Sequence, residues 1–134
     1  MTDLEFVLRA VDVLRAEGIR TWVSGGWGEE LRVLTPPCEH RGLELLYPAR
    51  DWQRVDALDL DWIEARHEPH TRAFRFEETV VELLLVERDK HGWFTQRPDG
   101  RHDWPADVFA SSGWLAVASA AALQGYRRAH AHAA

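Results

Sequence analysis

The sequence has 134 residues, of which 46% are hydrophobic and 28% are charged. These values are typical of one folded domain with a substantial core, so we expect residues 1–134 to form a single domain. The formal net charge of −6 argues against a nucleic-acid partner or an anionic membrane surface. It also disfavours binding of a polyphosphate unless a metal ion or a local basic patch assists.

The number of cysteines and the hydropathy of the chain indicate where in the cell the protein is expected. The single cysteine, Cys38, rules out an internal disulfide framework and suits a reducing cytoplasm, where we expect the protein to be located. No apolar run approaches the length of a membrane span, so we expect no membrane partner. The N-terminal stretch is amphipathic and lacks the layout of a signal peptide.

The first part of the chain predicts helices alternating with strands. Apolar residues recurring from Leu4 to Leu14 predict a helix over residues 3–17, capped by Thr2 or Asp3 and ended by Gly18. After it we expect a strand, a short helix, a break at two prolines, a second strand and a third helix. Their ranges are Arg20–Ser24, Trp27–Leu34, Pro36-Pro37, Leu43–Tyr47 and Arg50–Leu58.

The second part predicts a sheet and a closing helix. Strands are expected at Trp62–Arg66, Arg72–Phe76 and Thr79–Val86, the last two joined as a hairpin by Glu77-Glu78 and the last one central. Residues 87–113 are expected to form a long surface excursion with one short hairpin around residues 98–100. A short edge strand at 115–117, a Ser119-capped helix over 120–130 and a frayed tail complete an α+β fold with a mixed, twisted sheet.

One stretch of the sequence contains residues that could form a binding site. Gly25 and Gly26 stand between a predicted strand and a predicted helix, where glycine lets backbone N–H groups approach an anion closely. Glu44, on the next strand, could hold a divalent cation against that anion. The pattern indicates a nucleotide-phosphate and magnesium site, although glycine pairs are common at such turns and a lone strand glutamate is usually solvated.

The same stretch resembles the signature of a known family. Gly25, Gly26 and Trp27 open a run that continues without a gap to His40. It resembles the active-site motif of the small nucleotidyltransferases that modify aminoglycosides and lincosamides, in the DNA polymerase beta-like nucleotidyltransferase superfamily. Their pattern reads Gly-Gly-Trp, a short helix, Thr-Arg-x-His and Asp-x-Asp on a strand. Residues 113–124, GWLAVASAAALQ, also resemble the family's short strand and serine-capped helix, so the resemblance covers most of the chain.

The resemblance implies a minimal nucleotidyltransferase fold and a set of roles. Ser24, Gly25 and Gly26 would bind a nucleoside triphosphate, and Glu44 and Glu82 would hold Mg²⁺. Those two carboxylates and His40, as general base, would form the catalytic set acting on a hydroxyl of a small molecule. The resemblance therefore also predicts that the two carboxylates share one face of the sheet, with the glycine turn at the rim of the same cleft and its N–H groups open to it.

Several positions depart from the family pattern. The Asp-x-Asp pair falls on Gly42 and Glu44, and the Thr-Arg pair falls on Pro37 and Cys38. Gly42 offers no ligand, and glutamate is one methylene longer than aspartate, so we expect catalysis to be weak or lost. The alternative is a non-catalytic descendant that binds a ligand, or one that binds a partner protein or a second copy of itself.

Other readings of these residues stay open. Glu44 and Glu82 could be a structural pair bound to Arg41 or Arg75, and His40 could cap its loop. The run from His67 to His70 is disfavoured as a zinc site because it contains a proline and no cysteine. Three tryptophans in or beside the excursion could line a cleft for a planar or sugar ligand; they are Trp93, Trp104 and Trp114.

Overall fold

The sheet and its helices follow from the periodicity of the chain. The computed structural model describes residues 2–111 and 113–130. In chain order the elements are α1 Leu4–Ala16, β1 Trp22–Ser24, α2 Gly25–Leu31, β2 Leu43–Pro48, α3 Gln53–Asp56, β3 Asp61–Trp62, the 3-10 helix η1 Glu64–Arg66, β4 Thr71–Phe76, β5 Thr79–Asp89, β6 Gly92–Arg97, β7 Gly100–Asp103 and α4 Ala120–Ala129.

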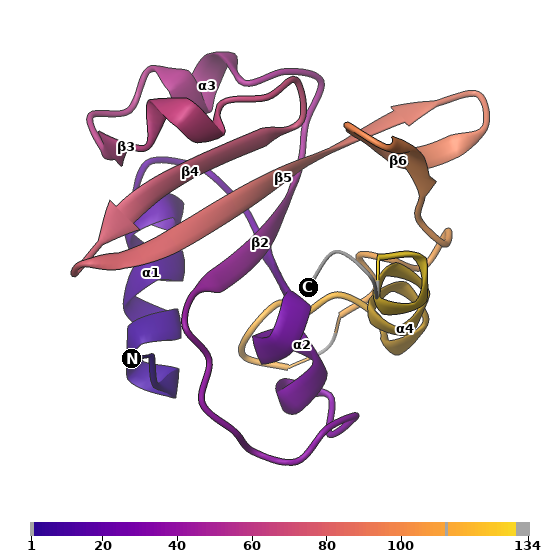
Figure 1. The fold of residues 1–134 in the computed structure, drawn as a ribbon, viewed down its shortest axis with the longest axis horizontal. Helices are drawn as coiled ribbons and strands as arrows, with labels where there is room; N and C mark the ends of the chain where they lie inside the picture. The colour runs from indigo at the N-terminus through magenta and orange to yellow at the C-terminus, as the bar shows by residue number, and fades with distance from the viewer. Residues whose placement is uncertain (1, 112, 131–134) are drawn as a thin grey trace.

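The strands form a mixed sheet in the order β1-β2-β5-β4-β3 (Figure 1). β2 runs parallel to β5, while β1, β4 and β3 pair antiparallel with their neighbours. The far end of β5 continues past this sheet and pairs with β6, which in turn pairs with β7. The prediction of an α+β fold with a mixed sheet and a central Thr79–Val86 strand is confirmed.

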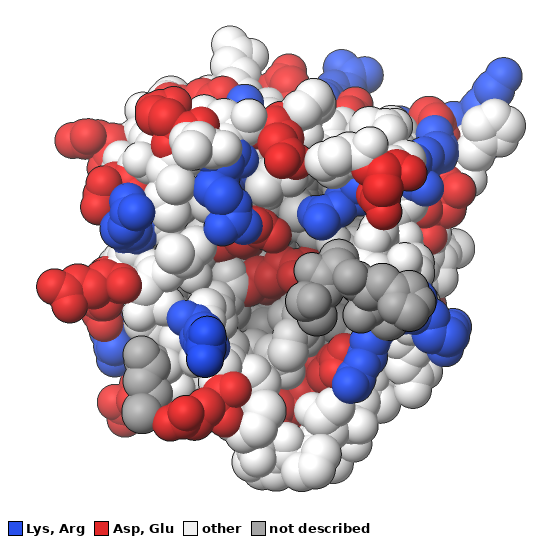
Figure 2. All heavy atoms as spheres, in the orientation of Figure 1, with Lys and Arg blue, Asp and Glu red and all other residues white. Residues whose placement is uncertain are grey.

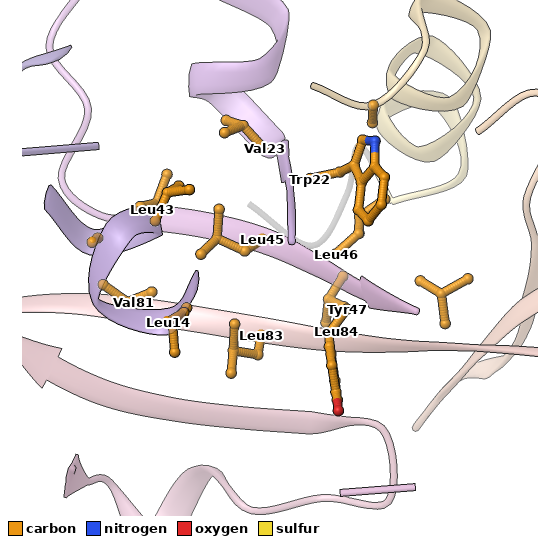
Figure 3. Packing of buried hydrophobic residues seen from close by; sticks show 14 of the residues in the cluster. Leu14, Trp22, Val23, Leu43, Leu45, Leu46, Tyr47, Val81, Leu83 and Leu84 are labelled. Atoms are coloured by element: carbon orange, nitrogen blue, oxygen red, sulfur yellow. The ribbon is translucent and has the colours of Figure 1, made fainter. Parts of the chain in front are cut away.

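Part of the core lies between α1 and the central strands, and the same buried cluster extends to Val108, Val117 and Leu123. The apolar stripe of α1 buries Val7, Val11 and Leu14. Leu14 joins the side chains of β2 and β5 in one buried cluster (Figure 3). Asp3 caps the helix by accepting a hydrogen bond from the Phe6 N–H at 2.8 Å, as the sequence predicted. Among the described residues, no helix is both long and apolar enough to cross a membrane.

Two expected helices differ from the structure. The second begins at Gly25 rather than Trp27, because Gly25 adopts a left-handed φ of 62° and turns the chain directly from β1 into α2. It ends at Leu31, two residues before Val33, which also has a positive φ. The helix expected over residues 50–58 shortens to the single turn of α3.

The strand expected at Trp62–Arg66 is wrong. Only Asp61 and Trp62 pair with β4, and Glu64–Arg66 coil into η1. The reading of residues 87–113 as a surface excursion is also partly wrong, because β5 extends to Asp89 and is followed by β6 and β7. The hairpin expected around residues 98–100 is present between those two strands. The edge strand at 115–117 is reduced to one parallel bridge between Val23 and Val117.

The last helix, α4, begins as expected. Ser119 caps it, because the Ser119 hydroxyl accepts a hydrogen bond from the Ala122 N–H at 3.1 Å. In Figure 1, α4 lies beside α2, and Leu123 of α4 packs on Gly28 of α2 closely enough that a Cβ there would meet it at 2.9 Å. The expected frayed tail, apart from Ala129 and His130, falls on residues 131–134, outside the described residues.

Candidate functional site

A row of side chains crosses the sheet at the level of Glu44. The register pairs Ser24 with Glu44, Glu44 with Glu82 and Glu82 with Ala73. Directly paired residues on neighbouring strands point to the same face, so the two carboxylates lie side by side on one face, as expected. This row lies beside the turn from β1 into α2.

Glu44 is the more deeply placed of the two carboxylates. Its Oε1 atom is buried and has no hydrogen-bond partner among the described residues. Burial and then the negative charge of Glu82 raise the pKa of Glu44 from 4.5 to about 7, while the charge of Arg97 opposes that rise. A buried carboxylate beside a second one is under electrostatic repulsion that either a proton or a cation would relieve.

Glu82 has a partner that the sequence did not indicate. Arg66, the last residue of η1, donates a hydrogen bond from Nη2 to Glu82 Oε2. Glu82 is therefore neither free nor paired with Arg41 or Arg75. The contact was missed because residues 62–66 were expected to be a strand, which would have placed Arg66 within the sheet rather than on a turn facing it.

The glycine pair of the turn lies between an acid and a histidine. A Cβ on Gly25 would lie 3.0 Å from Glu44 Oε2, and one on Gly26 would lie 2.8 Å from His40 Nδ1. Neither position accepts a side chain without displacing one of these groups. Outside the helical ladder, no acceptor for the N–H groups of Gly25 and Gly26 is found among the residues that the structure describes. Ser24 forms no cap hydrogen bond, and its buried Oγ has no partner there.

Two cavities meet at this turn. The first, about 490 Å³, lies between α2 and α4, and residues 24–26, Glu44 and Tyr126 are among those that line it. The second, about 510 Å³, is lined by Gly25, Gly26, His40, Glu44, Arg66 and Glu82, among others. The structure thus brings the predicted site residues around one turn, with Ser24 in the first cavity, Glu82 and His40 in the second, and the rest in both. Figure 2 shows acidic atoms in the hollow of this face with basic side chains around it.

His40 lines the second cavity and is held in place by several contacts. Its Nε2 lies 2.9 Å from Glu30 Oε1, and its ring packs on Trp27 with centroids 4.6 Å apart. The Thr2 hydroxyl donates a hydrogen bond to the His40 carbonyl at 2.6 Å and accepts one from Trp27 Nε1 at 2.9 Å. Hydrogen bonds from the Cys38 N–H and from His40 lower the pKa of Glu30. A histidine oriented by a carboxylate in this way can accept or donate a proton.

Comparison with solved structures decides the fold. A lincosamide antibiotic adenylyltransferase, LnuA, bound to lincomycin, is 17% identical over 88% of this chain and 81% of its own, with a TM-score of 0.67. ANT(2'')-Ia in complex with adenylyl-2''-tobramycin is 11% identical over 96% of this chain and 76% of its own, also with a TM-score of 0.67. The chain has the nucleotidyltransferase fold. A Thermotoga maritima protein described as a nucleotidyltransferase agrees, at 16% identity, 99% and 89% coverage and a TM-score of 0.56.

Two searches by sequence find no relative of this chain. No protein-family model matches the chain, and a search of curated proteins finds no match. The expected minimal nucleotidyltransferase fold is confirmed by the structural neighbours. At these identities the likeness concerns the arrangement of helices and strands.

Within the nucleotidyltransferase fold, the residues present suit one cation better than two. Glu44 and Glu82 supply adjacent carboxylates, and the orphaned Glu44 Oε1 is a free ligand atom. Gly42 supplies nothing, and a Cβ there would lie 2.9 Å from the Val80 carbonyl oxygen, so a side chain requires the backbone to shift. Arg66 already neutralises Glu82. Nothing in the sequence indicated that several other residues belong to the site, among them Arg66, Arg97 and Tyr126.

Proposed function

We propose that this chain binds a nucleoside triphosphate in the hollow beside the glycine turn, and that it transfers the nucleotidyl group to a small-molecule hydroxyl weakly or not at all. Ser24, Gly25 and Gly26 would contact the phosphates. The observation that carries the proposal is the pairing of Glu44 with Glu82 beside that turn. Gly42, which stands where the family pattern has the first aspartate of its Asp-x-Asp pair, offers no ligand. The structural neighbours that act on or bind antibiotics make aminoglycosides and lincosamides the first acceptors to test.

Magnesium would be held by Glu44 and Glu82, and it would supply charge to balance the phosphates in a protein whose net charge is −6. Two features of the chain determine how strongly this site would bind Mg²⁺. Arg66 competes with the cation for Glu82. Glu44 must lose the proton that its raised pKa favours. Both effects weaken binding, and a single cation leaves an acceptor hydroxyl less activated than two would, which is why we place transfer at a low rate.

His40 would serve as the general base if transfer occurs. Its carboxylate partner Glu30 orients the ring through Nε2, 2.9 Å away, and its place in the second cavity is open to a ligand. General bases held in this way contribute about 10²–10⁴-fold to a rate. The effect of His40→Gln on any measured turnover is therefore a direct check of that role.

The test is calorimetry with ATP and with GTP, each with and without Mg²⁺, followed by transfer of labelled nucleotide to a panel of aminoglycosides and lincosamides. We expect Mg²⁺-dependent binding, lost in Glu44→Gln, and tighter Mg²⁺ in Arg66→Gln, which frees Glu82. Glu78→Gln is the matched control, because Glu78 lies in a hairpin turn and does not line either cavity. Fast turnover by the wild type would contradict the low rate that we propose.

A second candidate function is binding of a partner protein or of a second copy. Trp114 is 68% exposed and Val33 is 87% exposed, and a contact surface would bury such side chains. If neither nucleotide binds under any condition above, this candidate replaces the first. Light scattering across a concentration series then distinguishes self-association from the need for another protein.

A further inference from the structure

The loop between α2 and β2 folds back so that three side chains with metal-binding atoms meet. One ligand atom each from Glu30, Cys38 and His40 lies within 4.8 Å of the other two. Glu30 Oε1 lies 2.9 Å from His40 Nε2, and Cys38 Sγ lies 3.8 Å from the same nitrogen. The Cys38 N–H donates to Glu30 Oε1 at 3.0 Å, which fixes the loop over the helix.

Two members of this cluster are held in place before any ligand arrives. The His40 ring is packed on Trp27, its carbonyl is bound by Thr2, and its Nδ1 faces Gly26. Nε2 is therefore the nitrogen that faces Glu30, and Cys38 Sγ lies 3.8 Å from Nε2 and 4.0 Å from Nδ1. The His40 and Glu30 side chains are 10% and 18% exposed, so both ligand atoms sit in a partly desolvated recess. Cys38 is exposed on the loop and is free to adjust its side chain.

We propose that Glu30, Cys38 and His40 bind one thiophilic divalent cation of the zinc class, at a site separate from the Glu44–Glu82 pair. Zinc takes sulfur at about 2.3 Å, imidazole nitrogen at about 2.0 Å and carboxylate oxygen at about 2.1 Å in tetrahedral geometry. Those bonds need ligand atoms about 3–4 Å apart, close to the separations present. The fourth position would be taken by water, since Cys38 is exposed to solvent. Magnesium, which prefers oxygen, is excluded by the thiolate and the imidazole.

Metal binding would replace the contact between His40 and Glu30 with three bonds from the metal to Glu30, Cys38 and His40. The Cys38 thiol loses its proton to solvent and the sulfur bonds to the metal. The proton between His40 Nε2 and Glu30 also leaves, either to solvent or through solvent to Nδ1, so that Nε2 and the carboxylate oxygen can bind the metal. The occupied site would clamp the loop to α2 beside Gly26. It would also leave the His40 ring protonated at Nδ1, so that this histidine could not act as a general base while the metal is bound. The inference does not depend on nucleotide binding, so either proposal can fail without the other.

The test uses the full chain after treatment with a chelator. Titration with Co²⁺ should give a near-ultraviolet thiolate-to-metal charge-transfer band that saturates at one equivalent, and calorimetry with Zn²⁺ should give the same stoichiometry. Cys38→Ser should abolish the band and weaken Zn²⁺ at least about tenfold, and Glu30→Gln should weaken it about tenfold. Glu39→Gln, an acid in the same loop, and the Glu44→Gln, Glu82→Gln double variant should bind Zn²⁺ like the wild type.

Three results would overturn the proposal. The first is absence of the charge-transfer band in the wild type, and the second is its survival in Cys38→Ser. The third is saturation at half an equivalent with a doubled mass in light scattering, which would assign the metal to cysteines of two chains. Because Cys38 is exposed, Cys38→Ser is expected to fold, and circular dichroism of each variant checks that the comparison is fair.

Discussion

At the scale of single residues, the environment of Glu44 disfavours its negative charge. Its Oε1 has no hydrogen-bond partner in the described part of the chain, and Glu82 adds a negative charge beside it. A carboxyl whose pKa is raised on folding binds its proton more tightly in the folded state than in the unfolded state. Its contribution to stability is thus fully present below pH 4.5 and is lost as the pH rises through about 7.

Glu44→Gln should remove this pH dependence. We expect the variant to be more stable than the wild type at pH 8, by at most about 3 kcal/mol, and equal to it near pH 4. Urea unfolding at both pH values measures the difference. Glu82→Gln should lower the pKa of Glu44 and flatten the profile in part, because it removes the second cause of the shift. A Glu44→Gln variant that is less stable at pH 8 would contradict the assigned cause.

Thr2 illustrates how one hydroxyl holds two segments together. It is 7% exposed and connects the His40 carbonyl with the Trp27 indole. Thr2→Val keeps the shape but leaves a donor and an acceptor unpaired. We expect a loss of about 1–3 kcal/mol in the free energy of unfolding, measured by urea titration. Thr2→Ser, which keeps the hydroxyl, is the matched control and should lose clearly less.

At the scale of elements, the β4–β5 hairpin carries strain that a substitution can release. Its two turn residues, Glu77 and Glu78, both have positive φ, 50° and 65°. Such turns favour Asn-Gly, because most side chains are strained in the left-handed region. Glu77 offsets part of this by pairing with Arg9 at 2.7 Å across the surface, whereas Glu78 is not part of that pair.

Glu78→Gly should therefore stabilise the protein by about 1 kcal/mol, and its thermal midpoint should rise by about 4 °C. Glu77→Gly should gain less, since it also loses the Arg9 ion pair. Scanning calorimetry of the two variants and the wild type checks both the sign and the order. Equal gains from the two substitutions would show that the Arg9 pair contributes nothing.

The elements also show what the sequence could predict and what it could not. Helix α1 and strands β2, β4 and β5 were predictable because their apolar residues repeat with the period of a helix or a strand. The turn between β6 and β7 was predicted at residues 98–100, but the full length of those two strands was not, since they carry mostly polar residues. The motif placed Glu44, Glu82 and the glycine turn together, but Arg66 was hidden because its position depends on η1, which has no apolar pattern.

At the scale of the whole molecule, the negative charge should favour cationic ligands. The net charge is −6, and acidic atoms lie in the hollow of the face in Figure 2. Attraction of this kind acts over the screening length of the solution, about 30 Å at 0.01 M salt and about 10 Å at 0.1 M. It favours polycations over singly charged ligands of similar size.

An aminoglycoside should therefore bind more tightly than a lincosamide at low salt, by about tenfold or more, and the advantage should shrink as salt rises. Calorimetry with tobramycin and lincomycin at two salt concentrations measures this. Glu44→Gln, Glu82→Gln should reduce the salt dependence for tobramycin, while Glu78→Gln should leave it nearly unchanged. An affinity for tobramycin that is independent of salt would place its binding away from the acidic hollow.

Binding of a cation at Glu44 should release a proton into the solution. With a pKa of about 7, close to half of the molecules carry that proton in a neutral solution. A cation that settles on the carboxylate must expel it, so each binding event should release about half a proton into the medium at pH 7 and almost none at pH 9. The heat of binding would then change with the ionisation enthalpy of the buffer, and a weakly buffered sample containing a dye would change colour as the site fills.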